Sequence, residues 1–223
     1  MLSDQNIYIK QLNLEEARAV YIGHSHQDFP SDELKPFSMI EKLWNNKCYF
    51  GYGFYEADGK NEVSAFSETA EIKPSEHILR AYAFLMADDS TNMLLLDYFA
   101  VCEEARGKGY GSAALNLLKE NCIDWDGILF EVEDETGAES EEEKLIRRRR
   151  IAFYEKSGVI MTDTKSHVFG VDYKLMVMPL ASEAAGEHID EKLTSMYKLM
   201  LPKMVFEREF QLRYEYINGD PEY

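Results

Sequence analysis

A chain of 223 residues, 45% of them hydrophobic, is long and apolar enough for one domain with its own core. Its formal net charge of −17 disfavours nucleic acids and anionic membranes as partners and suits a cationic substrate, although solubility alone would also explain it. No apolar stretch approaches the roughly 20 residues that cross a bilayer, and residues 1–5 lack the regions of a signal peptide, which predicts a cytoplasmic protein.

The first half of the chain predicts alternating strands and helices, from apolar periodicity and from aromatic-rich runs between turn residues. In chain order these are a strand at Ile7–Lys10, helices at Leu14–Gly23 and Asp32–Asn46, strands at Cys48–Tyr55 and Leu79–Met86, and a polar loop or irregular strand at Asn61–His77.

The second half continues the alternation, which favours one mixed sheet with helices packed on it. A long helical pattern at Ser182–Tyr214, interrupted by Pro202, predicts a C-terminal helical extension (181–223) that packs on the main domain (1–180) or supplies a homodimer surface. The other elements expected are strands at Met93–Val101 and Ile128–Glu133, helices at 110–121 and 143–157, and an antiparallel pair near Val159–Thr162 and Tyr173–Met178.

A glycine-rich turn, Arg106–Gly111, stands between the apolar strand 93–101 and the helix that follows. A helix start leaves backbone N–H groups unpaired and carries a positive partial charge, and glycines let the main chain approach an anion closely. The turn is therefore typical of a phosphate site, although a purely structural turn would also contain glycines. It lacks the Lys-Ser/Thr ending of a Walker loop and the third glycine of a Rossmann fingerprint.

The segment Leu95–Leu118 resembles the acetyl-CoA motif of the GNAT N-acetyltransferase superfamily, and the resemblance extends over about residues 80–178. It implies an α/β (α+β) fold with a single mixed, mostly antiparallel twisted sheet flanked by helices. It also implies that acetyl-CoA is the cosubstrate, without a metal, and that an acetyl group passes to a primary amine. The residues that it implies for cofactor binding are Phe99, Ala100, Val101, Arg106, Gly107, Lys108, Gly109, Tyr110, Gly111 and Ser112.

The strand at 128–133 contains the run Phe-Glu-Val-Glu, which resembles the corresponding strand of ribosomal-protein alanine acetyltransferases. The resemblance implies that Glu131 is the base that receives the ammonium proton, directly or through water. Asp97, in an otherwise apolar strand, and Glu133 are alternative bases.

The segment Arg150–Val159 is a second match, because many GNAT enzymes have a tyrosine near the end of this helix. The resemblance implies that Tyr154 protonates the CoA thiolate, whereas packing on the sheet is its structural alternative. Arg147 stands where many relatives have an asparagine. One or two of the four arginines 147–150 would meet CoA phosphates while the others pair with Glu139–Glu143 or lie in solvent.

Three cysteines, Cys48, Cys102 and Cys122, are odd in number and lack metal-ligand spacing, which favours reduced, packed thiols. The acceptor predicted from the acidic charge is a small cationic amine. A protein N-terminus is the alternative acceptor, and a non-catalytic acyl-CoA-binding or sensing module is the alternative function.

Overall fold

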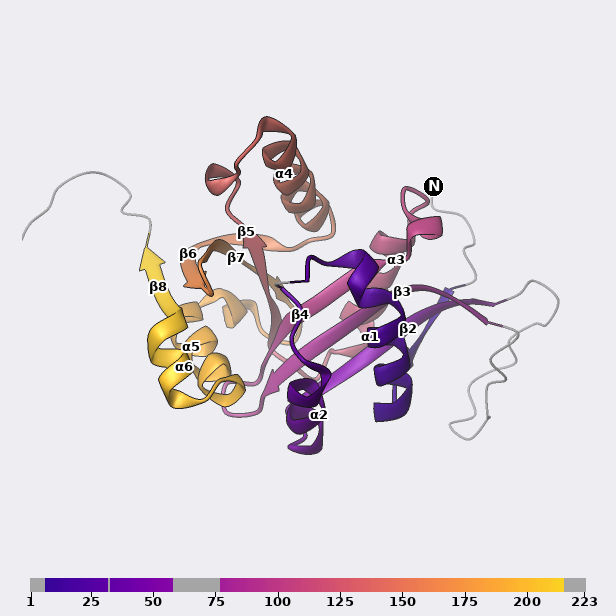
Figure 1. Ribbon diagram of the computed structural model, residues 1–223, viewed down its shortest axis with the longest axis horizontal. Helices are drawn as coiled ribbons and strands as arrows, with labels where there is room; N and C mark the ends of the chain where they lie inside the picture. Colours follow the sequence, from indigo (N-terminus) through magenta and orange to yellow (C-terminus); the bar gives the residue numbers. More distant parts are fainter. Residues whose placement is uncertain (1–6, 32, 58–76, 215–223) are drawn as a thin grey trace, which may run out of the picture. The chain divides into compact units, whose positions relative to one another are not determined.

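The computed structural model describes residues 7–31, 33–57 and 77–214 (Figure 1). They divide into two compact units. Unit 1 comprises the chain up to Met86 together with Asp97–Cys122, and unit 2 comprises Ala87–Leu96 and the chain from Ile123 onward. The predicted loop or irregular strand at Asn61–His77 lies outside the described residues except for His77, which begins a strand.

Unit 1 is built on antiparallel strands that pair in sequence order, β1 with β2 and β2 with β3. The sequence predicted each of its helices and strands, although α2 is shorter than expected. Its elements are β1 (Ile7–Gln11), α1 (Leu14–Asp28), α2 (Phe37–Asn45), β2 (Tyr49–Ala57), β3 (His77–Asp88, to Met86), the end of β4 (Met93–Val101) and α3 (Tyr110–Asn121).

The second helix starts at Phe37, so the prediction that it begins at Asp32 is wrong. Pro36 is its N-cap residue, with φ −56° and ψ 134°. Proline disfavours helical backbone at the residue before it, and here Lys35 is outside the helix. Residues 29–31 and 33–36 therefore belong to the connection between α1 and α2.

The two faces of the unit 1 strands are covered by different helices. On one face, the ring centroid of Tyr21 in α1 lies 5.8 Å from that of Phe84 in β3. Tyr52 in β2 is paired in register with Ala83, so it belongs to the opposite face. Its hydroxyl interacts with the thiol of Cys122, directly after α3. Helix α1 and helix α3 therefore pack on opposite faces of these strands.

Unit 2 continues from the first half of β4, in the strand order β4-β5-β7-β6-β8. The β4–β5 pair is parallel, and the other three pairs are antiparallel. The predicted fold class, one mixed and mostly antiparallel sheet flanked by helices, is confirmed. The elements after β4 are β5 (Gly127–Glu133), α4 (Glu141–Lys156), β6 (Ile160–Val168), β7 (Val171–Pro179), α5 (Ile189–Met200), α6 (Lys203–Glu209) and β8 (Phe210–Tyr214).

The C-terminal segment is interrupted at Pro202 as predicted, but the prediction that its helical pattern continues to Tyr214 is wrong for residues 210–214. Pro202 separates α5 from α6, and the chain then forms β8, which pairs antiparallel with β6 from Val168–Phe210 to Thr164–Tyr214. Residues 210–214 alternate between large apolar or aromatic and polar side chains, a pattern that suits an edge strand. The proposed division into 1–180 and 181–223 stays a prediction.

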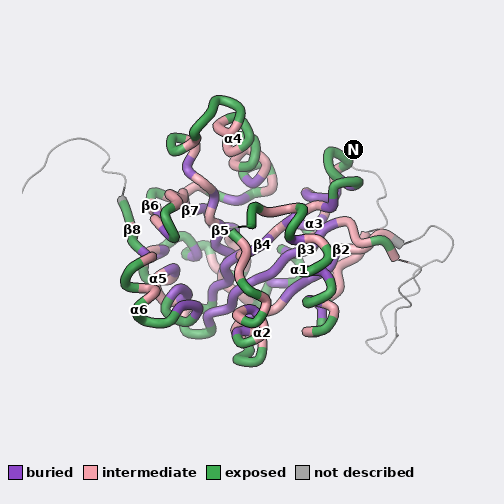
Figure 2. The backbone as a smooth tube through the Cα atoms, viewed as in Figure 1, coloured by how far each residue is buried: buried purple, intermediate pink, exposed green. Residues whose placement is uncertain are grey.

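Burial in unit 2 is uneven between its helices (Figure 2). Helix α5 buries five residues, whereas Tyr154 is the one buried residue of α4. No helix in the described part of the chain combines the length and the apolar character needed to cross a membrane.

Candidate active site

The glycine-rich turn lies in unit 1, between a short 3-10 helix at Glu103–Ala105 and α3. Gly107 has φ 73° and Gly109 has φ 89°, in the left-handed region that favours glycine. A Cβ atom at Gly107 would meet no atom within 4 Å. Backbone conformation, and not crowding, therefore explains the glycine at this position.

The N-terminus of α3 has no side-chain cap, in contrast to α1 and α4. Asn13 accepts from the N–H of the third residue of α1, and Ser140 does the same for α4. At α3 the N-cap residue is Gly109, which has no side chain to donate or accept, and Ala113 N makes the first bond, to Gly109 O, at 3.2 Å. The N–H groups of residues 110–112 precede that bond, so they and the helix dipole suit a phosphate group.

The side chain of Arg106 is engaged inside unit 1. Its Nη2 atom pairs with Asp28 Oδ1 at 2.5 Å, and its Nε donates to Val101 O at 3.0 Å. Asp28 also accepts from the hydroxyl of Tyr82 at 3.0 Å. These contacts link the turn to the end of α1, to β3 and to the end of β4. The guanidinium of Arg106 therefore stabilises the conformation of the turn.

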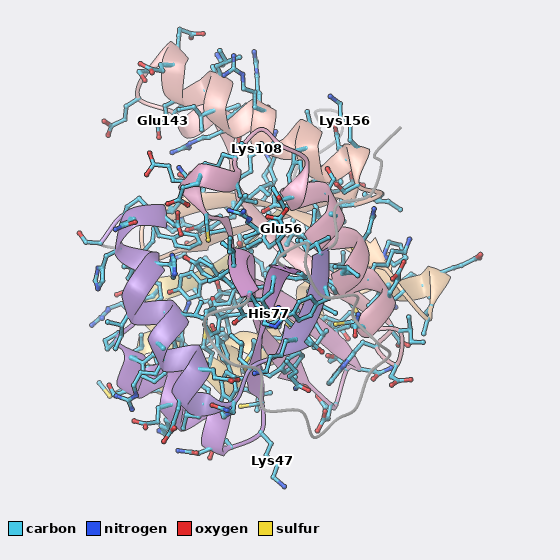
Figure 3. The ribbon with its side chains drawn as sticks, turned by 90° about the vertical axis from the view of Figure 1, so that its right-hand side faces the viewer. Lys47, Glu56, His77, Lys108, Glu143 and Lys156 are labelled. Carbon is cyan, nitrogen blue, oxygen red and sulfur yellow. The ribbon has the colours of Figure 1, made fainter. Side chains whose placement is uncertain are left out.

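A polar cluster that sequence reasoning missed surrounds the first residue of α3. Arg80 Nε donates to Glu56 Oε2 at 2.6 Å, and the Arg80 guanidinium lies 5.4 Å from the ring centroid of Tyr110. A hydrogen bond from Tyr110, together with Arg80 and the charge of Lys108, holds the pKa of Glu56 below its usual value. Glu56 and Lys108 are labelled in Figure 3, one from β2 and one from the turn. No local motif marks Glu56 or Arg80, because both come from strands far from the turn in sequence.

Strand β4 pairs with β5 over its first half. The paired positions run from Met93–Gly127 to Leu96–Phe130. Beyond them, Asp97 and Tyr98 contact two different atoms of Lys35, its side-chain Nζ and its backbone N. Phe99, Ala100 and Val101 follow at the end of the strand.

Asp97 is bound on both of its oxygens within unit 1. Lys35 Nζ donates to Oδ1 at 2.6 Å and the Tyr49 hydroxyl to Oδ2 at 2.5 Å, and the aspartate side chain is only 8% exposed. Tyr98 adds to this link, because its hydroxyl accepts from Lys35 N at 3.0 Å and donates to Glu33 O at 3.0 Å. Asp97 and Tyr98 therefore anchor the connection between α1 and α2.

Glu131 lies in unit 2, in the second half of β5, and its side chain is half-buried. Its Oε1 accepts a hydrogen bond from the Ser166 hydroxyl in β6 at 2.7 Å, and its Oε2 accepts one from the Tyr197 hydroxyl in α5 at 2.6 Å. Two neutral donors thus contact the carboxylate, one on each oxygen. No pattern in the sequence had pointed to either donor.

Tyr154 lies in the last turn of α4, with its ring against Phe130 of β5 at 5.0 Å between centroids and 62° between planes. Burial raises the pKa of Tyr154 to about 12, although the nearby charge of Arg150 acts in the opposite direction. The phenol therefore keeps its proton through the whole physiological range.

Glu131 and Tyr154 approach β5 from different sides. Phe130 and Glu131 are successive residues of a strand, so their side chains point to opposite faces. Tyr154 packs on the Phe130 face and the donors to Glu131 lie on the other. The structure consequently does not bring the two predicted catalytic side chains into contact with each other.

Glu133 is paired with two arginines of α4. Its two oxygens lie 3.0 Å from Arg147 and 2.9 Å from Arg150. Arg147 also pairs with Glu143 at 2.5 Å and donates to Asp134 O at 2.7 Å. The arginine that replaces the asparagine of many relatives is therefore bound to the end of β5 and to its own helix.

Among the described residues, no group of three His, Cys, Asp or Glu side chains could hold a metal ion.

A comparison of the sequence with models of known protein families supports the features found at the start of α3. The model of the acetyltransferase (GNAT) family matches residues 17–159, which is more than half of the chain. The chain belongs to the GNAT family of acetyltransferases. The predicted family is thereby confirmed, and the match covers the turn, Glu131 and Tyr154.

Solved GNAT structures share the fold at low sequence identity. A putative GNAT acetyltransferase from Bacteroides thetaiotaomicron has a TM-score of 0.57 and 16% identity, covering 86% of this chain and 98% of that one. Spermidine N-acetyltransferase from Vibrio cholerae, in complex with CoA and spermine, has a TM-score of 0.52 and 12% identity, covering 80% and 98%. The ribosomal-protein-S18-alanine N-acetyltransferase from Escherichia coli has a TM-score of 0.50 and 16% identity, covering 82% and 97%. No protein of curated function matches the sequence.

Proposed function

We propose that this GNAT protein transfers an acetyl group from acetyl-CoA to the primary amine of a small cationic molecule. The observation that carries the proposal is the start of α3, where two glycines with positive φ precede three N–H groups that have no capping side chain. Such a site binds phosphate groups, and CoA carries a pyrophosphate. Family membership then supports the thioester of acetyl-CoA as the donor of the acetyl group.

The proposed cofactor contacts are mostly main-chain groups. Residues 107–112 would hold the pyrophosphate. The main-chain groups of residues 99–101, at the end of β4, would contact the pantetheine arm and the thioester carbonyl. When bound, acetyl-CoA supplies an activated acetyl group and a thiolate leaving group. Arg106 acts in this proposal through the turn, because its guanidinium is already bound to Asp28 and Val101.

Among the three carboxylates considered as base, the contacts support Glu131. Asp97 is paired with Lys35, and Glu133 with two arginines. These ion pairs bind Asp97 and Glu133 to other elements of the structure. The hydroxyls of Ser166 and Tyr197 hold the Glu131 carboxylate in a defined orientation. Glu131 would take the proton of the ammonium group, directly or through a water molecule.

Tyr154 is the proposed acid for the thiolate. Because burial holds its pKa at about 12, it is protonated whenever the leaving group forms. In a direct transfer the nitrogen that loses a proton and the sulfur that gains one are joined through the same acetyl carbon, so Glu131 and Tyr154 would both have to reach that carbon.

The acceptor proposal rests on charge and on the spermidine acetyltransferase likeness. A net charge of −17 attracts cations from a distance, and the structural neighbours include enzymes named for spermidine. A protein N-terminus is the second candidate, supported by the likeness to the S18-alanine enzyme. Purified protein, acetyl-CoA and a panel of polyamines, other amines and Ala-starting peptides would test this by following free thiol. Binding of CoA without thiol release on any amine would instead support the binding-module alternative.

We expect Tyr154→Phe to lower turnover by about 100-fold or more while the affinity for CoA stays near wild type, because only the proton donor is removed. The ring still packs on Phe130, so the thermal unfolding midpoint should change little. Steady-state kinetics and calorimetry with CoA check both parts. As a matched control, Phe153→Leu alters the neighbouring aromatic without removing a hydroxyl. Wild-type turnover in Tyr154→Phe would leave this tyrosine a packing residue.

The pH dependence of wild-type turnover is a further readout of the same assignment. With a pKa of about 12, Tyr154 loses its proton only as the pH approaches that value. Turnover is therefore expected to show no alkaline decline from this group at lower pH.

A further inference from the structure

The hydrogen bonds to Glu131 come from two separate elements of unit 2. Ser166 in β6 is fully buried, and Tyr197 in α5 is 7% exposed. They donate to different oxygens of the same carboxylate, at 2.7 Å and 2.6 Å. Distances of this size are typical of hydroxyl donors to a charged acceptor. Both oxygens of the Glu131 carboxylate are therefore held by hydrogen bonds, which fixes its orientation.

Tyr197 is itself held firmly by the C-terminal segment. Its ring centroid lies 4.6 Å from that of Phe210 in β8. Helix α5 packs through four other fully or nearly buried residues, Ile189, Leu193, Met196 and Met200. Strand β8 is bound to β6 by its antiparallel pairing. The position of the Tyr197 hydroxyl thus depends on α5 and β8 together.

Both donors lie beyond the part of the chain that matches the family. The match ends at residue 159, whereas the donors are at 166 and 197. Glu131 lies inside the match. Glu131, inside the family match, is therefore held by two residues that lie outside that match.

We propose that Tyr197 is a positioning residue for Glu131, so that the C-terminal segment Ile189–Tyr214 completes the active site of this protein. The inference rests on the proposed function, because it takes Glu131 as the base. The two hydroxyls contact different oxygens of Glu131, so together they set the orientation of its carboxylate. Holding the side chain in one orientation also removes the entropic cost of ordering a flexible glutamate during the reaction.

A purely structural role for the same hydroxyl makes a different prediction. A buried tyrosine hydroxyl needs a hydrogen-bond partner, and Glu131 supplies one whether or not it is catalytic. In that case the loss of the hydroxyl changes stability, and any effect on turnover is independent of Glu131. A double-mutant cycle separates these two roles.

The test measures kcat and KM for wild type, Tyr197→Phe, Glu131→Gln and the double variant, with thermal unfolding of each. We expect Tyr197→Phe to lower kcat by about tenfold, the effect of one hydrogen bond to a charged group, with an unchanged KM for acetyl-CoA. In the Glu131→Gln background the same substitution should change kcat by less than about twofold, because the base through which it acts is already lost.

Phe210→Leu is the matched control, since it disturbs the packing of Tyr197 and keeps the hydroxyl. Its effect on the unfolding midpoint calibrates how much kcat responds to packing alone. Wild-type kcat in Tyr197→Phe, or losses that multiply in the double variant, overturn the inference while the proposed function stands. A Glu131→Gln enzyme with full activity overturns it as well. The absence of acetyl transfer in the wild type, for every amine tested, overturns the proposed function and the inference together.

Discussion

Gly109→Asp is expected to weaken CoA binding by at least about 100-fold while the protein remains folded. The substitution places a carboxylate at the N-cap of α3, next to the N–H groups of residues 110–112. Two negative charges about 4 Å apart repel by a few kcal/mol at the effective dielectric constant of a protein surface. The aspartate side chain would also accept from those N–H groups and compete with the pyrophosphate for them.

The fold should tolerate this change. Gly109 has φ 89°, and a non-glycine residue in this region costs on the order of 1–3 kcal/mol. Part of the cost is offset because aspartate is a favourable N-cap residue. Calorimetric titration with CoA and circular dichroism measure the two effects separately.

Gly109→Asn is the matched control, because it has the same shape and backbone strain without the charge. We expect it to bind CoA more tightly than the aspartate variant. Equal affinity in both variants would assign the loss to backbone strain or steric hindrance. Wild-type affinity in Gly109→Asp would remove the turn from the cofactor site.

The turn and its flanking elements could be predicted because local chemistry determines them. Strand 93–101 and helix 110–121 have the bounds expected from the sequence. Glycine at Gly107 and Gly109 permits the positive φ angles that join them. Each of these features depends on residues only a few positions apart, and a single sequence contains that information.

The C-terminal strand could not be predicted in the same way. Residues 210–214 directly follow a helix, and an alternation over so short a segment does not by itself distinguish a strand from the last turns of that helix. They form a strand because β6 offers them a partner, with Val168 opposite Phe210. This partner lies far away in the sequence, so the local pattern does not reveal the pairing.

The partners of the candidate carboxylates are non-local for the same reason. Lys35 reaches Asp97 across 62 positions, and Tyr197 reaches Glu131 across 66. Sequence placed three carboxylates in two strands without showing what contacts them. The structure supplies the ion pairs of Asp97 and Glu133 and the hydroxyl contacts of Glu131.

Glu131→Gln is expected to lower turnover by about 100- to 10,000-fold near neutral pH, the range usual for loss of a general base. The amide keeps the size of the carboxylate, and its oxygen and nitrogen can still bond with the hydroxyls of Ser166 and Tyr197. The overall fold and the affinity for CoA should consequently stay close to wild type. Circular dichroism and calorimetry check both.

The pH dependence of the remaining activity distinguishes a lost base from a lost binding charge. As the pH rises, the amine loses its proton without help, so the defect of Glu131→Gln should shrink. A missing contact to a cationic substrate would raise KM and would not be repaired by alkali.

Asp97→Asn and Glu133→Gln are the matched controls, since each removes a carboxylate charge that already has a cationic partner. Both variants should lower the thermal unfolding midpoint, because each leaves a cation unpaired. The pH dependence of their turnover should stay close to that of the wild type. If the alkali-repaired defect follows Asp97 or Glu133 instead, that carboxylate is the base and Glu131 is a structural acceptor for Ser166 and Tyr197.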